Sequence, residues 1–201
     1  MYTATISKTK QMVGISIFAA IIIALQAFAT AVNYVTPGTI PIALILPPLV
    51  IGAAMYGMKA GAILGVCFSL VVVASGIFGL APTSAIMWNA SPIVFLVATI
   101  GRGLAVGVAA GGMYKLFAKK DAFMGVWAAA IVAPVVNTGI FIFVLFFYVE
   151  IMGIVIGTAG TGFIQRLIAA FVGINFMMEM VVNIVLAPAI ARIINIGKKM
   201  R

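Results

Sequence analysis

The chain has 201 residues, of which 65% are hydrophobic and only 7% are charged, and its mean hydropathy is +1.32. A soluble domain carries charge on about a quarter of its residues, so lipid must solvate much of this surface, and a soluble enzyme is excluded. The formal net charge of +9 does not indicate nucleic-acid binding, because the basic residues stand singly or in small groups between apolar stretches.

Six apolar runs follow one another along the chain. A helical span needs about 20 apolar residues, and the runs lack the period-two alternation of transmembrane strands. The predicted spans are residues 12–32, 41–57, 60–80, 92–114, 124–149 and 164–192. The fold class is therefore an all-α membrane protein, a bundle of six transmembrane helices. We expect residues 1–201 to form this single transmembrane domain, with no room for a soluble one.

The first two runs each have an alternative interpretation. Lys8 and Lys10, an apolar run and the sequence at 27–29 resemble a secretory signal with its cleavage site. The run is about 21 residues long and five similar segments follow, so we interpret it as a retained helix. The second run is the weakest span, because prolines bend or shorten a helix. Its prolines are Pro41, Pro47 and Pro48.

The basic residues predict the orientation in the membrane. An even number of spans places both termini on one side, and Lys and Arg gather on the cytoplasmic side of membrane proteins. The opposite connections contain neither, so both termini are predicted to be cytoplasmic in a multi-pass protein of a prokaryotic plasma membrane. The residues on the basic side are Lys8, Lys10, Lys59, Lys115, Lys119, Lys120, Arg192, Lys198, Lys199 and Arg201. The outer connections, around 33–40, 81–91 and 150–163, are longer and favour a small-molecule site beneath them.

Small residues at four-residue spacing predict close contact between helices in a membrane. Ala20 and Ala24, continued by Ala27 and Ala31, form such a row in the first span. This row fits an internal contact and an external partner equally well. Two further rows consist of Gly57, Gly61 and Gly65, and of Gly103, Gly107 and Gly111, and we expect both to pack inside the bundle.

A few polar residues lie deep in apolar runs, where a charge costs at least about 2.5–3.5 kcal/mol. Arg102 lies about ten residues into the fourth span, which is roughly 15 Å from its outer end. Asn175, Glu179 and Asn183 recur every four residues and so form one stripe facing the bundle interior. Asn137 lies at a similar depth in the fifth span. The charge of Arg102 is neutralised either by Glu179 or by a ligand anion. The asparagine side chains form hydrogen bonds either to a ligand or to neighbouring helices.

Three other residues lie near the outer side, and two of them, Arg166 and Trp88, have two interpretations each. Arg166 lies near the outer end of the sixth span, where it either extends to the lipid headgroups or turns inward to a ligand. Trp88 and Asn89 fall in the second outer connection. A tryptophan there is either an interfacial anchor or a side chain that closes a pocket.

The residues that the sequence lacks narrow the function. The chain has no histidine, a single cysteine and three acidic residues, so we expect no catalytic site, no metal site and no cofactor. No phosphate-binding loop occurs, so the chain does not hydrolyse ATP by itself.

Several stretches resemble the substrate-binding S components of energy-coupling factor transporters for vitamins. The resemblance covers nearly the whole chain and includes the alanine pair Ala20 and Ala24, which matches the small-residue motif that docks S components on their membrane scaffold. The other matching stretches are residues 36–41, 57–61, 101–104 and 137–139.

The resemblance implies that the chain captures a vitamin from outside, and that a shared transmembrane scaffold with two ATPase subunits drives its delivery inward. The implied pocket lies under the outer connections and between the last three helices. It would draw on Trp88, Asn89, Arg102, Asn137, Arg166, Asn175 and Glu179. A buried arginine favours a carboxylate, and few aromatic residues line the inferred pocket, so pantothenate fits best. Folate, niacin and riboflavin are the alternative vitamins, and a small channel, a scaffolding subunit or a membrane enzyme is the alternative class.

Overall fold

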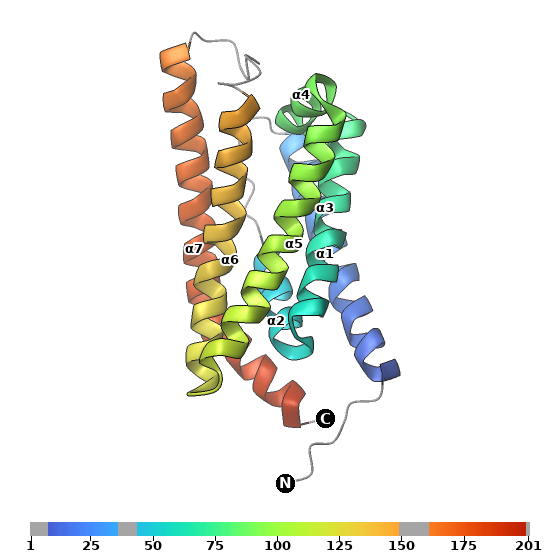
Figure 1. Ribbon diagram of the computed structural model, residues 1–201, viewed down its shortest axis with the longest axis vertical. Helices are drawn as coiled ribbons and strands as arrows, with labels where there is room; N and C mark the ends of the chain where they lie inside the picture. Colours follow the sequence, from blue (N-terminus) through green and yellow to red (C-terminus); the bar gives the residue numbers. More distant parts are fainter. Residues whose placement is uncertain (1–7, 36–43, 149–160, 200–201) are drawn as a thin grey trace.

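The computed structural model describes residues 8–35, 44–148 and 161–199, and in the last of these stretches the side chains of residues 173 and 176–197. Within these residues the protein is entirely helical (Figure 1). The helices are α1 Lys8–Val35, α2 Leu46–Tyr56, α3 Met58–Ile77, α4 Pro82–Ala90, α5 Pro92–Phe117, α6 Ala122–Phe146 and α7 Thr161–Lys199. Five segments are long and apolar enough to cross a membrane: α1, α3, α5, α6 and Phe176–Gly197 of α7. The chain is therefore a multi-pass membrane protein.

The second predicted span is shorter than expected. Helix α2 has 11 residues, which is about 16 Å of helix against the roughly 30 Å of a hydrocarbon core. Pro47 and Pro48 lie in its first turn, where the fixed φ and missing N–H of proline are tolerated. Helix α1 ends at the upper end of Figure 1, and the α2–α3 turn lies at the lower end. The chain must therefore cross back from top to bottom between them, and α2 forms the lower part of this crossing. Residues 36–43 lie outside the described part, and the count of six spans remains a prediction.

The predicted outer connection at 81–91 contains a further helix, α4, of nine residues. Proline is well suited to the first turn of a helix, and Pro82 and Pro92 occupy that position in α4 and α5. Ser91 between them is extended. The sequence at 81–91 is thus a helix followed by a one-residue break.

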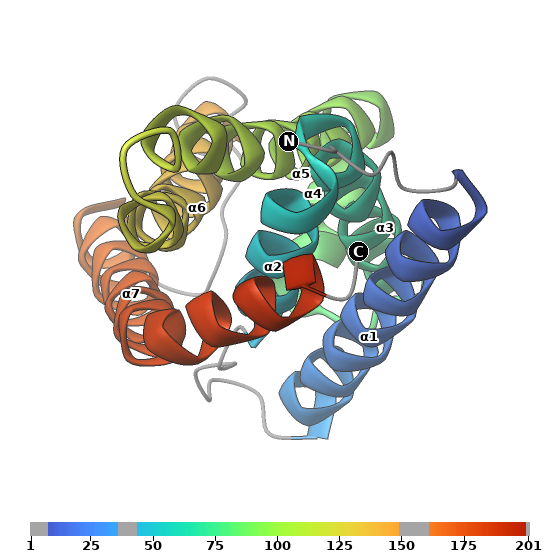
Figure 2. The same cartoon turned by 90° about the horizontal axis from the view of Figure 1, so that it is seen from below.

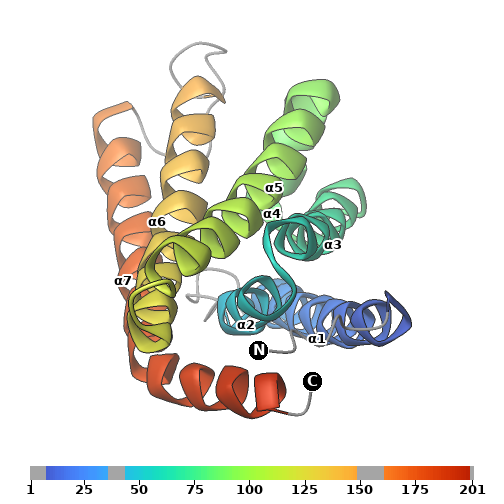
Figure 3. The ribbon, with the colours of Figure 1, turned by 60° about the horizontal axis from the view of Figure 1, so that its bottom comes forward.

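Helix α5 lies at the centre of the arrangement, with α3 on one side and α6 on the other, and α7 packs on α6 (Figure 3). Helix α1 packs on α2 and α3 at the edge. The short α2 sits inside the lower end, where it contacts α3, α5, α6 and α7 and contributes Leu49 and Val50 to the main apolar core. Proline inside a helix removes a hydrogen bond and bends it. Helix α7 contains Pro188, and its lower part turns beneath α2 (Figure 2).

The predicted glycine rows pack against each other between α3 and α5. A Cβ at Gly65 would collide with the carbonyl of Gly103, and a Cβ at Gly107 would collide with that of Gly61. Small residues allow this close backbone approach in a membrane. The expectation of internal packing is therefore confirmed for both rows except Gly57, which is exposed and where a Cβ would meet nothing within 4 Å. Gly57 has a φ of 91° and forms the turn between α2 and α3, a conformation that glycine adopts without steric cost.

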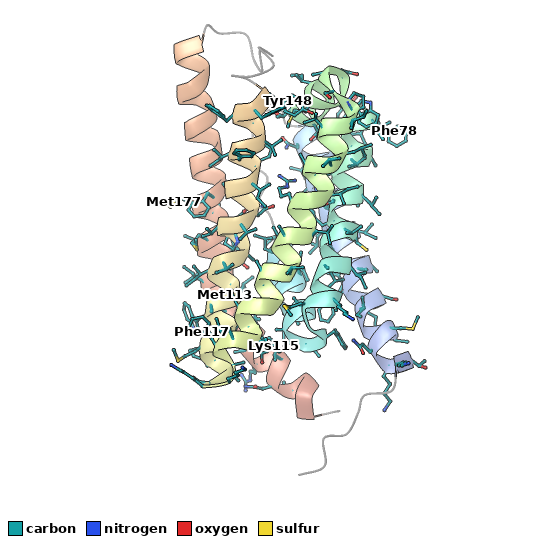
Figure 4. The ribbon with its side chains drawn as sticks, viewed as in Figure 1. Phe78, Met113, Lys115, Phe117, Tyr148 and Met177 are labelled. Carbon is teal, nitrogen blue, oxygen red and sulfur yellow. The ribbon has the colours of Figure 1, made fainter. Side chains whose placement is uncertain are left out.

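The basic side predicted from the sequence corresponds to one end of the bundle. The start of α1, the α2–α3 turn, the α5–α6 turn and the end of α7 all lie at the lower end of Figure 1, and Lys115 lies at the same end in Figure 4. This arrangement is what a positive-inside protein requires. The assignment of that end to the cytoplasm remains a prediction.

Candidate functional site

A buried polar cluster joins α6 to α7 at mid-depth. The Asn137 side-chain amide donates to both carboxylate oxygens of Glu179, at 3.3 and 3.2 Å, and the Thr138 hydroxyl donates to one of them at 3.3 Å. Only 8% of Asn137, 5% of Thr138 and 2% of Glu179 is exposed. A buried carboxylate requires such donors because it has lost its water. The structure therefore brings together two of the residues predicted for the site, Asn137 and Glu179.

The polar stripe of α7 continues one turn below Glu179. Asn183 is fully buried and donates its side-chain amide to the backbone carbonyl of Glu179 at 2.8 Å. Among the described residues, the side-chain oxygens of Asn137 and Asn183 have no hydrogen-bond partner. These two oxygens are buried acceptors. The inward orientation predicted for the stripe is confirmed at Glu179 and Asn183.

Arg102 of α5 lies beside this cluster. Its guanidinium carbon is 5.5 Å from the ring centroid of Phe68 on α3 and 5.3 Å from that of Phe141 on α6, distances at which ring faces attract a cation. The side chain is partly buried, its Nε has no hydrogen-bond partner in the described part of the chain, and Glu179 is the charge that acts on it electrostatically. A guanidinium can bind a carboxylate through two parallel hydrogen bonds. Arg102 is thus placed to receive an anion.

An aromatic cluster lies at the upper end of the bundle, and its member on α5, Phe95, is about 10 Å from Arg102 along that helix. Trp88 is partly buried and meets Phe95 edge to face, with 6.2 Å between the ring centroids. Tyr148 is fully buried, and its hydroxyl donates to the carbonyl of Ser91 at 3.0 Å. Figure 4 shows Tyr148 at the upper end of α6, turned toward α4 and α5. This hydrogen bond joins the end of α6 to the α4–α5 junction.

The other residues predicted for function lie in different places. Asn89 is exposed on α4. Arg166 and Asn175 belong to α7, but their side chains lie outside the described residues. Ala20 and Ala24 are both exposed on α1. The structure therefore places Asn89, Ala20 and Ala24 outside the mid-depth cluster, while the roles of Arg166 and Asn175 stay predictions.

Three residues at the cluster were not predicted. Thr138 and Phe141 lie on the same helix as Asn137, and Phe141, four residues further on, shares its face, so the position of Asn137 was a usable signal for Phe141. Phe68 lies on α3, and nothing in the sequence relates it to Arg102. Within the described residues, no three His, Cys, Asp or Glu side chains come close enough to hold a metal ion.

The chain is similar to the pantothenic acid transporter PanT of Lactococcus lactis subsp. cremoris (strain MG1363). The two are 25% identical over 193 residues, which cover 92% of this chain and 93% of the transporter. No protein-family model and no solved structure matches the chain. The resemblance to vitamin transporters seen in the sequence is thus confirmed by a relative that spans nearly the whole length of both proteins.

Proposed function

We propose that this chain is the substrate-binding subunit of a transporter of the energy-coupling factor type, and that its substrate is pantothenate. The observation that carries the proposal is Arg102, a partly buried cation between two rings, with an Nε that has no hydrogen-bond partner in the described structure. The similarity to a pantothenic acid transporter supports the choice of vitamin.

The chemistry of pantothenate matches the groups at mid-depth. The vitamin has one carboxylate, one amide and two hydroxyls on a short branched chain. Arg102 would bind the carboxylate, because a desolvated cation is stabilised most by an opposite charge with paired hydrogen bonds. The side-chain oxygens of Asn137 and Asn183 would accept hydrogen bonds from hydroxyl or amide groups. Further contacts to the vitamin are proposed nearer the outer end of the bundle, from Trp88, Asn89, Arg166 and Asn175.

Transport requires proteins beyond this chain. The sequence has no phosphate-binding loop, so we propose that a transmembrane scaffold and two ATPase subunits act with it, and that the chain itself is not an enzyme. Ala20 and Ala24 are exposed on α1 and would form the surface that docks on the scaffold.

The alternatives differ in ligand or in class. Folate, niacin and riboflavin are the other vitamins to test. Folate and riboflavin contain fused rings and are larger than pantothenate. A small channel needs a continuous polar path through the bundle, whereas the lower half around α2 is filled by an apolar core that includes Leu49, Val106 and Ala130. A channel or a scaffolding subunit is therefore the second choice.

Binding to the purified chain tests the proposal. The wild-type chain should bind pantothenate, and Arg102→Gln should weaken this binding by about 2–5 kcal/mol, as expected for loss of one partner of a desolvated charge pair. The same substitution should weaken binding of the uncharged alcohol analogue much less. Isothermal titration calorimetry in detergent measures both affinities, and Arg192→Gln, at an exposed position on α7, is the control.

Two results would contradict the proposal. Failure of the wild-type chain to bind pantothenate excludes this vitamin, and mass spectrometry of small molecules that copurify with the chain then identifies another. Equal losses for the acid and the alcohol in a normally folded Arg102→Gln protein exclude the carboxylate as the partner of Arg102.

A further inference from the structure

Arg102 and Glu179 carry opposite charges in the same part of the bundle, yet each is held by other groups. The carboxylate of Glu179 accepts hydrogen bonds from Asn137 and Thr138 of α6. The guanidinium of Arg102 lies over the rings of Phe68 and Phe141. Helices α3 and α6, which carry the two rings, lie on opposite sides of α5 (Figure 3). Two rings from different helices therefore lie against the guanidinium and restrain it.

This restraint matters because an arginine is long and flexible. Two opposite charges attract strongly in a low-dielectric interior, and an unrestrained guanidinium would be drawn toward the carboxylate of Glu179. A direct pair with two hydrogen bonds would occupy the N–H groups with which Arg102 binds a ligand carboxylate. Ring faces attract a cation electrostatically and do not occupy its N–H groups. Aromatic neighbours thus stabilise the charge while its donors stay available.

We infer that Phe68 and Phe141, together with the donors Asn137 and Thr138, keep Arg102 and Glu179 apart and so reserve the Arg102 N–H groups for the ligand. This inference rests on the proposed function in so far as the ligand is an acid. Phe68 and Phe141 are accordingly positioning residues, which act on ligand affinity through Arg102.

A double-mutant cycle tests this role, with pantothenate as the probe. Phe141→Leu removes the ring face and keeps an apolar side chain. In the wild-type background it should weaken pantothenate binding about tenfold, the upper range of a cation–ring interaction. In the Glu179→Gln background no carboxylate remains to capture the arginine, so the same substitution should weaken binding only about twofold or less. Phe68→Leu should behave in the same way.

The control is Phe143→Leu on the same helix, because 70% of Phe143 is exposed; it should leave affinity unchanged in both backgrounds. Equal losses from Phe141→Leu in both backgrounds would show that the ring contacts the ligand directly, which overturns the inference.

Melting temperatures of the ligand-free variants give a second readout that needs no ligand. If loss of the ring allows Arg102 to pair with Glu179, then Glu179→Gln should lower the melting temperature more in the Phe141→Leu protein than in the wild type. An equal decrease in both proteins overturns the inference. Failure of the wild type to bind pantothenate, by contrast, contradicts only the proposed substrate.

Discussion

At the scale of single residues, the carboxylate of Glu179 is a buried charge that the protein must stabilise. Only 2% of the residue is exposed, so its charge has lost most of its hydration and needs compensation from the protein. Asn137 and Thr138 supply hydrogen bonds, and Arg102 supplies an opposite charge. Removal of the arginine leaves the donors in place but removes the opposite charge.

We therefore expect Arg102→Gln to lower the free energy of unfolding of the ligand-free protein. The loss should stay below the roughly 3–5 kcal/mol of a directly bonded buried pair, because Asn137 and Thr138 still donate hydrogen bonds to the carboxylate. Adding Glu179→Gln should restore most of the stability, since a neutral amide no longer needs a counter-charge. Thermal unfolding of the wild type, the two single variants and the double variant measures this. A double variant less stable than Arg102→Gln would show that Arg102 does not neutralise Glu179.

The sequence predicted the polar members of the cluster and missed its apolar ones for a physical reason. Arg102, Asn137 and Glu179 stand out because polar groups are costly within an apolar run. Phe68 and Phe141 do not stand out, because the chain has 14 phenylalanines and aromatic residues are common on the lipid-facing surface. Whether a ring faces a cation or lipid depends on how helices from distant parts of the chain pack together, which run length and periodicity do not specify.

At the scale of elements, run length predicted the long helices and could not predict the short ones. Helices α3, α5 and α6 lie within a few residues of their predicted bounds. Helix α2 differs because its neighbours bury it on all sides, so an apolar run of that composition needs no lipid. Helix α4 was predicted as a loop, since prolines at 82 and 92 indicated breaks; each in fact begins a helix.

The contact between α3 and α5 allows a sharp test of helix packing. A Cβ at Gly103 would collide with the Ser69 hydroxyl and the Gly65 carbonyl, and the Ser69 hydroxyl also donates to Thr99 of α5 at 2.8 Å. Gly103→Ala should therefore destabilise the protein by about 1–3 kcal/mol, the usual cost of overpacking.

The matched control lies two residues away on the same helix. A Cβ at Gly101 meets nothing within 4 Å, and alanine favours helix more than glycine by up to about 1 kcal/mol, so Gly101→Ala should be neutral or stabilising. Thermal unfolding in detergent compares the two variants. Equal stability of Gly103→Ala and the wild type would show that α3 and α5 do not pack at this distance.

At the scale of the whole molecule, α1 and α7 expose side chains of different kinds on the surface of the bundle. Helix α1 packs mainly on α2 and α3 through residues such as Ile22, which is fully buried. Its alanine row, Ala20, Ala24, Ala27 and Ala31, is exposed along the helix. On the other side, Met177 projects from the outer face of α7 (Figure 4). A row of small side chains allows another helix to pack closely against it, whereas large apolar side chains are typical of a surface that contacts lipid.

The last prediction concerns assembly and follows from that open row. If α1 docks on a transmembrane scaffold through Ala20 and Ala24, a tryptophan at either position would hold the two helices apart. Ala20→Trp and Ala24→Trp should therefore abolish pantothenate uptake by the complete transporter in vesicles. They should leave pantothenate affinity of the isolated chain nearly unchanged, because α1 lies away from the polar cluster of α6 and α7. Val32→Trp is the control: Val32 is 39% exposed and lies about 120° around the helix from Ala20 and about 80° from Ala24, so it should not disturb uptake. Loss of pantothenate binding by the isolated Ala20→Trp or Ala24→Trp chain would instead assign the alanine row to the internal packing of the bundle.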